Sequence, residues 1–210
     1  MPFAADRFLP ALAARIRQAA GADGRALIAI DGRSLAGKTQ LATDLLPHLG
    51  PEAGILAVDS YFEPLNDPAT TPVAERLWRL RLDALKAALE TLKAGKPVRH
   101  TPYDWDRDRF HPETAIRPGI VLVEGLGALR AELRPFYDFA IWIEGRHATR
   151  LDRIVARDGD RYLDLWVGQW LPLEEAYMAA EKPWKAADVY VAGVDMTIGE
   201  VGAQLLASDP

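Results

Sequence analysis

One octapeptide constrains the fold of this chain more than any other feature: Gly32-Arg33-Ser34-Leu35-Ala36-Gly37-Lys38-Thr39. It matches the pattern G-x-x-x-x-G-K-[ST] in full. An apolar run at residues 25–32 precedes it, and a helical pattern at residues 38–50 follows it. The sequence therefore predicts a buried strand, a loop and a helix in succession, which is the context that this pattern requires.

The glycines of this octapeptide suit it to hold phosphate. Without side chains in the way, successive backbone N–H groups can turn inward around an anion. The helix that follows adds the positive end of its dipole. We expect Lys38 to bridge the β- and γ-phosphates of ATP and Thr39 to offer its hydroxyl to Mg²⁺. The residues expected to bind the nucleotide are Gly32, Ser34, Ala36, Gly37, Lys38, Thr39 and Gln40.

Apolar runs and helical patterns alternate along the rest of the chain. Four further runs are typical of buried strands, at residues 54–60, 119–125, 139–145 and 187–193. Helical patterns lie at residues 78–92, 147–158 and 162–182, and Pro172 can bend the last of them. Residues 61–72 are expected to form a loop, and residues 96–118 a long, partly irregular excursion. The alternation predicts an α/β protein with the three-layer P-loop NTPase fold, a mostly parallel five-stranded sheet and helices on both faces.

Composition limits the partners of this chain. The net charge of −5 argues against broad nucleic-acid binding, which needs a basic face. The chain has no cysteine, so disulfides, thiolate nucleophiles and zinc–thiolate sites are excluded. No apolar run approaches the roughly 18 residues of a membrane span, and charged residues interrupt the helical N-terminal segment, at residues 5–20. We therefore expect no nucleic-acid partner, no membrane and a cytoplasmic location.

Four short segments resemble those of a known protein family: VDSYF at residues 58–62, YDW at 103–105, VLVEG at 121–125 and TRLDRIVARD at 149–158. In this order, and with the octapeptide, they resemble the uridine kinase-like kinases, a group akin to phosphoribulokinase and the bacterial pantothenate kinases. The resemblance spans about residues 25–192. It implies one P-loop kinase domain over residues 1–210, with a small lid around residues 150–165.

The resemblance also assigns two acidic residues. Asp59 occupies the position of the catalytic base, and Glu124 looks like the acid that orients Mg²⁺ through water. The carboxyl end of a parallel strand faces the ligand crevice of such folds, so both positions suit these roles. The structural alternatives are a turn cap for Asp59 and a buried salt bridge for Glu124.

Basic residues follow the fourth predicted strand at helical spacing: Arg150, Arg153 and Arg157. In the similar kinases an arginine-bearing helix closes over ATP and offsets charge on the transferring phosphoryl group. Arg153 and Arg157 are therefore catalytic candidates beside Lys38 and Asp59. A solvated helix face, paired with neighbouring aspartates, is the alternative.

The candidates for binding the acceptor are Asp59, Phe62, Tyr103, Trp105 and Arg109. In the similar kinases the aromatic rings of a Y-D-F element pack around a nucleoside, and a histidine follows closely. In this chain the nearest histidine is His111. Several basic residues are candidates for an anionic acceptor, with surface solvation as the alternative: Arg79, Arg81, His100, Arg107 and Arg109.

These patterns together predict ATP-dependent phosphoryl transfer to a hydroxyl of a small molecule, a nucleoside or a related metabolite. One alternative keeps this chemistry with pantothenate, a sugar phosphate or a nucleotide as acceptor. Another is a non-catalytic regulatory module in which ATP orders the lid. Because members of the similar family often assemble, a homo-oligomer is also compatible with the resemblance.

Overall fold

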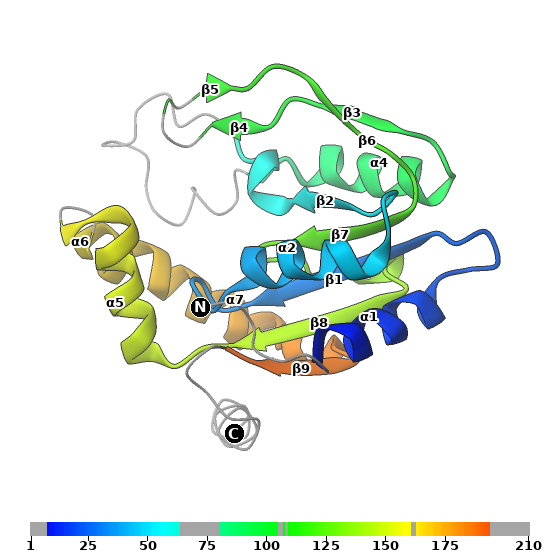
Figure 1. Ribbon diagram of the computed structural model, residues 1–210. Helices are drawn as coiled ribbons and strands as arrows, with labels where there is room; N and C mark the ends of the chain where they lie inside the picture. Colours follow the sequence, from blue (N-terminus) through cyan, green and yellow to red (C-terminus); the bar gives the residue numbers. More distant parts are fainter. Residues whose placement is uncertain (1–7, 64–79, 105–106, 108, 161–162, 194–210) are drawn as a thin grey trace.

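A parallel sheet of five strands forms the centre of the computed structural model, which describes residues 8–63, 80–104, 107, 109–160 and 163–193 (Figure 1). The strand order is β2-β7-β1-β8-β9, and every neighbouring pair is parallel. This confirms the predicted sheet. The strands are β1 (Ala26–Gly32), β2 (Gly54–Ala57), β7 (Ile120–Glu124), β8 (Phe139–Glu144) and β9 (Val189–Ala192).

Helices cover both faces of the sheet because the apolar side chains of β1 alternate between them. On one face, Ile28 and Ile30 belong to the same buried cluster as residues of α1 (Phe8–Ala19) and α2 (Lys38–Leu49). On the other face, Leu27 packs with α4 (Leu82–Lys93), and Ala29 packs with α7 (Leu171–Glu181). The central strand is fully buried as a result.

The strand order places the octapeptide at the middle of the sheet edge. β1 lies between β7 and β8, and Ile30 is the register partner of Glu124. On the other side of β7, Ala57 of β2 pairs with the same Glu124. The carboxyl ends of β1, β2 and β7 therefore meet where ligands bind in open α/β sheets.

Two predicted segments differ from the structure near this edge. The second strand ends at Ala57, and a short 3-10 helix, η1 (Val58–Tyr61), follows, so Asp59 lies on a turn beyond the strand. Residues 96–118 were expected to form a long, partly irregular excursion, and the described residues among them include two small hairpins (Figure 1). One pairs β3 (Val98–His100) with β6 (Thr114–Ile116), and the other pairs β4 (Tyr103–Asp104) with β5 (Arg109–Phe110).

The predicted helix at residues 162–182 is divided. α5 (His147–Asp158) is followed by α6 (Leu163–Leu165), a π-helical segment at Trp166–Trp170, and α7. Pro172 has no N–H to donate to the carbonyl four residues earlier, so the regular ladder is interrupted there. Two 3-10 turns, Arg134–Phe136 and Pro183–Ala186, flank β8 and β9.

Some expectations fall on residues outside those that the structure describes. The N-terminal helix is seen from Phe8 onward, and residues 1–7 precede the described part. Trp78 and the tail after residue 193 are likewise outside it. Within the described residues, no helix combines the length and the hydropathy needed to cross a membrane.

Candidate functional site

The phosphate loop runs from the end of β1 to the start of α2, as its glycines require. A Cβ added to Gly32 would lie 2.1 Å from the carbonyl oxygen of Ile143 on β8, so no side chain fits there. Gly37 has a φ of 108° and precedes the first residue of α2. This backbone conformation favours glycine, and it turns the chain into the helix with the N-terminal N–H groups directed at the loop.

Lys38 and Thr39 project from the first turn of α2 toward the sheet edge. Lys38 Nζ donates hydrogen bonds to the carbonyl oxygens of Gly32 at 3.0 Å and Arg33 at 2.9 Å, so its side chain lies over the loop. Thr39 Oγ1 donates to Glu124 Oε1 at 3.2 Å. The two loop residues expected to meet phosphate and metal are thus beside the predicted acid of β7.

Asp59 and Glu124 form an acidic pair at this edge. Burial raises the pKa of Glu124, and the charge of Asp59 raises it further, while Lys38 and the Thr39 hydrogen bond oppose the shift. Reduced hydration also raises the pKa of Asp59, although its carboxyl reaches solvent, and the charges of Lys38 and Arg157 oppose this. Two carboxylates that repel one another are stabilised when a cation binds between them.

A divalent cation fits this donor set in a particular way. Among the described residues, no group of three or more His, Cys, Asp and Glu side chains converges to hold a metal by itself. Mg²⁺ commonly takes one or two protein oxygens, and substrate phosphates and water complete its octahedron. Thr39 and Glu124 offer such oxygens, so the residues suit a metal that arrives with a nucleotide.

The remaining nucleotide-binding candidates, Ala36, Ser34 and Gln40, all make contacts within the protein. Ala36 is fully buried and lies against Gly145, so it shapes the loop through packing. The backbone N–H of Ser34 already donates to Glu174 of α7 at 2.6 Å. Gln40 is exposed, and its Nε2 donates to Asp44 Oδ1 at 2.8 Å along α2.

The two candidate arginines of α5 occupy different positions. Arg153 Nη1 donates to the carbonyl oxygen of Leu35 at 2.7 Å, so this guanidinium is bound to the loop itself. Arg157 donates two hydrogen bonds to Asp158, at 2.7 and 2.9 Å, and lies 5.5 Å from the ring centre of Trp166. Those hydrogen bonds raise the pKa of Arg157, and the charge of Asp59 acts in the same direction. The charges of Arg157 and the predicted base Asp59 therefore influence one another.

The acceptor candidates gather around η1 and the hairpin of β4 and β5. Phe62 and Tyr103 are buried, and the Tyr103 ring meets Phe110 edge-on at 6.4 Å. Arg109 is exposed on β5, and Trp105 lies outside the described residues. Of the five acceptor candidates, Tyr103 and Phe62 are thus packed inside the protein.

Most of the basic residues considered for an anionic acceptor have protein partners. Arg81 Nη2 donates to the carbonyl oxygens of Ser60 and Thr101, each at 3.2 Å, and its guanidinium lies 4.6 Å from the ring centre of Phe110. Arg107 pairs with Asp104 at 3.1 Å. The ring of His100 stacks on Tyr61 at 5.3 Å. Arg79 falls outside the described residues.

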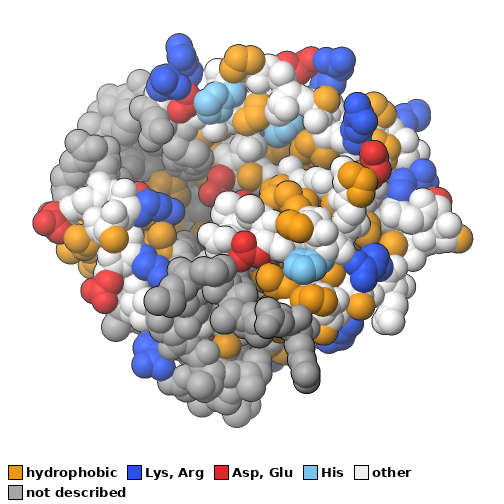
Figure 2. Space-filling model, viewed as in Figure 1, with side chains coloured by type: hydrophobic (Ala, Val, Ile, Leu, Met, Phe, Trp, Pro, Cys, Tyr) orange, Lys and Arg blue, Asp and Glu red, His pale blue; other side chains and the backbone are white. Residues whose placement is uncertain are grey.

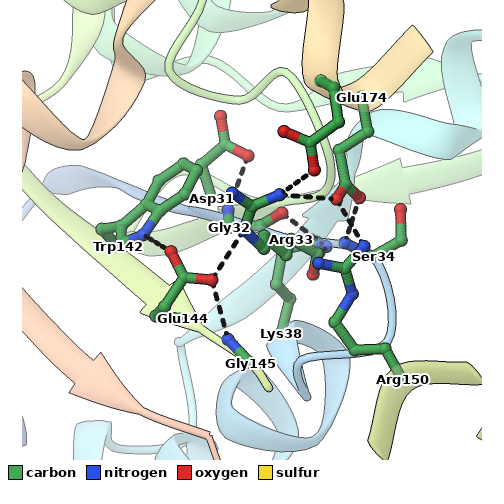
Figure 3. Close-up of polar contacts among 11 residues, drawn as sticks. Asp31, Gly32, Arg33, Ser34, Lys38, Trp142, Glu144, Gly145, Arg150 and Glu174 are labelled. Carbon is green, nitrogen blue, oxygen red and sulfur yellow. Dashed lines mark hydrogen bonds and ion pairs between the residues drawn. The ribbon is translucent and has the colours of Figure 1, made fainter. Parts of the chain in front are cut away.

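Sequence reasoning missed a buried ionic cluster behind the loop, shown in Figure 3. Arg33 Nε lies 2.8 Å from Glu144 Oε1 at the end of β8, and Arg33 also pairs with Glu174 and Glu175. Arg150 of α5 pairs with Glu174 at 2.6 Å. The side chains of Arg33, Arg150, Glu144 and Glu174 are at most 8% exposed, which no spacing in the sequence revealed.

Asp31 is a second buried acid that the sequence pattern did not single out. Its carboxylate accepts hydrogen bonds from the N–H groups of Gly127 at 3.2 Å and Leu129 at 2.7 Å, and from the Tyr177 hydroxyl at 2.7 Å. Burial raises the pKa of Asp31, and the Leu129 N–H is the strongest opposing influence. Asp31 therefore joins the strand before the phosphate loop to α7 and to the segment after Glu124.

The surface is hollowed where these elements meet. Figure 2 shows a depression between α5 and the edge of the sheet, with acidic side chains beside it. A separate cavity of about 570 Å³ runs along the outer edge of β2, with Ile55, Ser60, His100 and Ile116 among its lining residues. No residue of the phosphate loop lines that cavity, so it is distinct from the depression.

Comparison with known proteins gives relatives in sequence. No protein-family model matches the chain. It is 26% identical to a uridine kinase of Halobacterium salinarum over 185 residues, 78% of each chain, and 26% identical to a uridine kinase of Chlamydia pneumoniae over 183 residues, 80% of this chain and 81% of the other. It is 32% identical to the inorganic pyrophosphatase TTM2 of Arabidopsis thaliana over 149 residues, which are 66% of this chain and 21% of that protein.

Comparison of structures gives the same fold. A possible uridine kinase from Bacillus stearothermophilus has a TM-score of 0.64 at 22% identity, covering 87% of this chain and 96% of the other. A putative fructose transport system kinase from Silicibacter sp. TM1040 has a TM-score of 0.63 at 19% identity, covering 87% and 98%. At these identities the likeness is one of fold.

Proposed function

Because this chain is related to the uridine kinase-like P-loop kinases in both sequence and fold, we propose that it transfers the γ-phosphate of ATP to a hydroxyl of a small molecule. The acceptor in this proposal is a nucleoside or a related metabolite. The observation that carries it is the hydrogen bond between Thr39 and Glu124, with Lys38 over the loop and Asp59 across from it. A protein that only binds ATP does not need a general base at the position of Asp59.

Each of these residues has a definite task in the proposed reaction. The loop N–H groups and Lys38 hold the phosphates, and Thr39 and Glu124 provide oxygens for Mg²⁺. When bound, Mg²⁺ supplies positive charge to the phosphate oxygens. Asp59 accepts the proton of the attacking hydroxyl, which leaves the acceptor oxygen free to bond to phosphorus.

Arg157 completes this arrangement on the α5 side. Negative charge spreads over the equatorial oxygens of the phosphoryl group as it transfers, and a cation placed there lowers the barrier. The charge interaction between Arg157 and Asp59 supports this position for Arg157. In the proposed mechanism, Arg157 moves from Asp158 toward the phosphates when ATP binds.

The partners of the basic residues favour a neutral acceptor. Arg81 and Arg107 are already bound to protein oxygens, so an anionic acceptor would have to displace these contacts. Tyr103 and Phe62 supply aromatic surface of the kind that suits a nucleoside. A nucleoside hydroxyl is therefore preferred over a sugar phosphate or pantothenate, which remain acceptors to be tested.

A coupled ADP-release assay tests the proposal. ATP and Mg²⁺ would be combined with nucleosides, nucleoside monophosphates, pantothenate and phosphorylated sugars, with Asp59→Asn as the control variant. We expect turnover with one class of acceptor, a loss of at least about 100-fold in Asp59→Asn, and an ATP affinity by calorimetry within about threefold of the original.

Other outcomes would point elsewhere. ATP binding without turnover on any acceptor would favour the regulatory module. Equal turnover in Asp59→Asn would remove Asp59 from the mechanism.

A further inference from the structure

Glu174 connects three parts of the described chain through one buried carboxylate. It lies on α7 and is fully buried. Its Oε2 accepts the backbone N–H of Ser34 at 2.6 Å, and its Oε1 accepts Arg150 Nη2 at 2.6 Å (Figure 3). A single side chain of α7 therefore binds both the phosphate loop and α5.

These contacts enclose Leu35, which has an unusual backbone conformation. Its φ of 61° lies in the left-handed region, which is unfavourable for a residue other than glycine. On one side of Leu35, Glu174 fixes the N–H of Ser34, and on the other, Arg153 binds the carbonyl oxygen of Leu35 at 2.7 Å. Such a conformation persists only where surrounding contacts determine it.

The charged side chains of this cluster pair with one another. Arg150 is 2% exposed in its side chain and pairs with Glu174, while Arg33 pairs with Glu144, Glu174 and Glu175. A buried carboxylate keeps its charge at such a position only if cations and donors compensate for lost hydration. Both arginines are therefore buried and paired with carboxylates next to the loop.

We propose that Glu174 is a positioning residue for the nucleotide, because it holds Ser34 and, through Arg150, α5 in the arrangement that directs the loop N–H groups at the phosphates. The inference rests on the proposed function, since it takes a nucleotide as the ligand of the loop. Both oxygens of Glu174 are used within the protein, so it acts through the loop backbone and does not touch the nucleotide.

Two variants of Glu174 test this role, with a neighbour as the control. Ser34 and Arg150 donate to different oxygens of Glu174, and Glu174→Gln replaces one of these oxygens with an NH₂ group that cannot accept either bond. The double variant Arg150→Met/Glu174→Met removes a buried charge of each sign with side chains of similar size, a change that folded proteins commonly tolerate. Glu175→Gln is the matched control, because Glu175 pairs with Arg33 but has a side chain that is 57% exposed.

The measurements are ATP and ADP affinity by calorimetry, thermal unfolding without ligand, and steady-state kinetics. We expect both Glu174 variants to bind ATP and ADP about tenfold more weakly, because binding must then order the loop, including the unfavourable conformation of Leu35. The KM for ATP should rise in parallel while kcat at saturating ATP changes less than about threefold, because Asp59 and Arg157 are unaltered. For Glu175→Gln, the affinities for ATP and ADP, the KM for ATP and kcat should all stay within about twofold of those of the original chain.

The outcomes separate this inference from the function on which it rests. A folded double variant with the original nucleotide affinity would overturn the role of Glu174 and leave the proposed function standing. A loss of thermal stability without a change in affinity would likewise overturn it. If the unaltered chain binds ATP but phosphorylates no acceptor, the proposed kinase function is wrong, and the nucleotide affinities of the Glu174 variants still test the role of Glu174. Failure of the original chain to bind either nucleotide would overturn both.

Discussion

Glu124 carries its charge at a position where the protein compensates for it incompletely. Its side chain is buried, Thr39 supplies one hydrogen bond, and Asp59 adds repulsion. Because the pKa of Glu124 is raised above its ordinary value of 4.5, the folded chain binds a proton more readily than the unfolded chain. The free energy of unfolding therefore decreases as pH rises from about 4.5 through the raised pKa.

We expect Glu124→Gln to be more stable than the original chain at pH 7.5 in the absence of metal, because the amide has no charge to bury. A gain of about 1 kcal/mol would raise Tm by about 2–4 °C in a chain of this size. The gain should shrink as the pH is lowered toward 4.5, where Glu124 becomes protonated.

Thermal unfolding in a chelating buffer between pH 5 and 8 measures this difference. The same variant should lose its Mg²⁺-dependent turnover, since glutamine is a poor ligand for the ion. A variant less stable than the original across this range would show that the Glu124 charge is well compensated.

Along α5, successive turns have different relations to the site. Arg150 and Arg153 fix the first part of the helix to Glu174 and to the Leu35 carbonyl. Arg157, one turn further, is bound to its neighbour Asp158 and to the Trp166 ring. The helix is therefore attached to the loop at its beginning, and its last turn holds Arg157, the cation that the proposed mechanism brings to the phosphates.

This difference predicts distinct kinetic defects. Arg157→Gln should lower kcat about 100-fold and leave the ATP affinity within about threefold, because its charge is needed while the phosphoryl group transfers. Arg153→Gln should instead raise the KM for ATP several-fold with a smaller effect on kcat, because it alters the loop. Steady-state kinetics with ATP varied at saturating acceptor distinguish the two. Identical defects in both variants would mean that α5 acts as one unit.

The elements were predictable from sequence to the extent that their patterns are long. The five apolar runs became five parallel strands, because runs such as residues 119–125 are buried on both faces. The hairpins of residues 98–116 were not predicted, since strands of two or three residues carry no measurable period. Asp59 was predicted to end a strand but lies on η1. The apolar run of the sequence continues through Val58, whereas the pairing of β2 with β7 ends at Ala57.

The candidate site was predictable only where a motif carries the chemistry. Lys38, Thr39 and Glu124 come together in the structure because pattern and strand order both locate them. Glu174 could not be found in this way. Its partners, Ser34 and Arg150, are 140 and 24 residues away in the sequence, and only the packing of α7 behind the loop joins them.

In the chain as a whole, the phosphate loop is the junction of separate layers. β1 leads into it, and Asp31 at the end of that strand binds Tyr177 of α7. α2 leaves it, and Lys38 lowers the pKa values of Asp31, Asp59 and Glu124 through its charge. α5 and α7 contact it from behind through Arg153 and Glu174. We therefore expect a ligand that binds at this loop to raise the free energy of unfolding of the entire described fold.

A ligand that binds only the folded chain raises its free energy of unfolding by RT ln(1 + [L]/Kd), about 2.7 kcal/mol at 100 times the Kd. We expect ATP with Mg²⁺ at that level to raise Tm by about 5–10 °C, and ATP with a chelator to raise it less. Lys38→Met should abolish the increase, because it removes the cation expected to meet the phosphates.

The same variant without ligand should unfold at a lower temperature than the original chain at pH 8, because Asp31, Asp59 and Glu124 lose a nearby positive charge. The difference in Tm between the two chains should become smaller at lower pH, where those carboxylates protonate. Differential scanning fluorimetry across pH and nucleotide concentration measures both effects. A Lys38→Met chain that is stabilised by ATP as strongly as the original would place the nucleotide away from this loop.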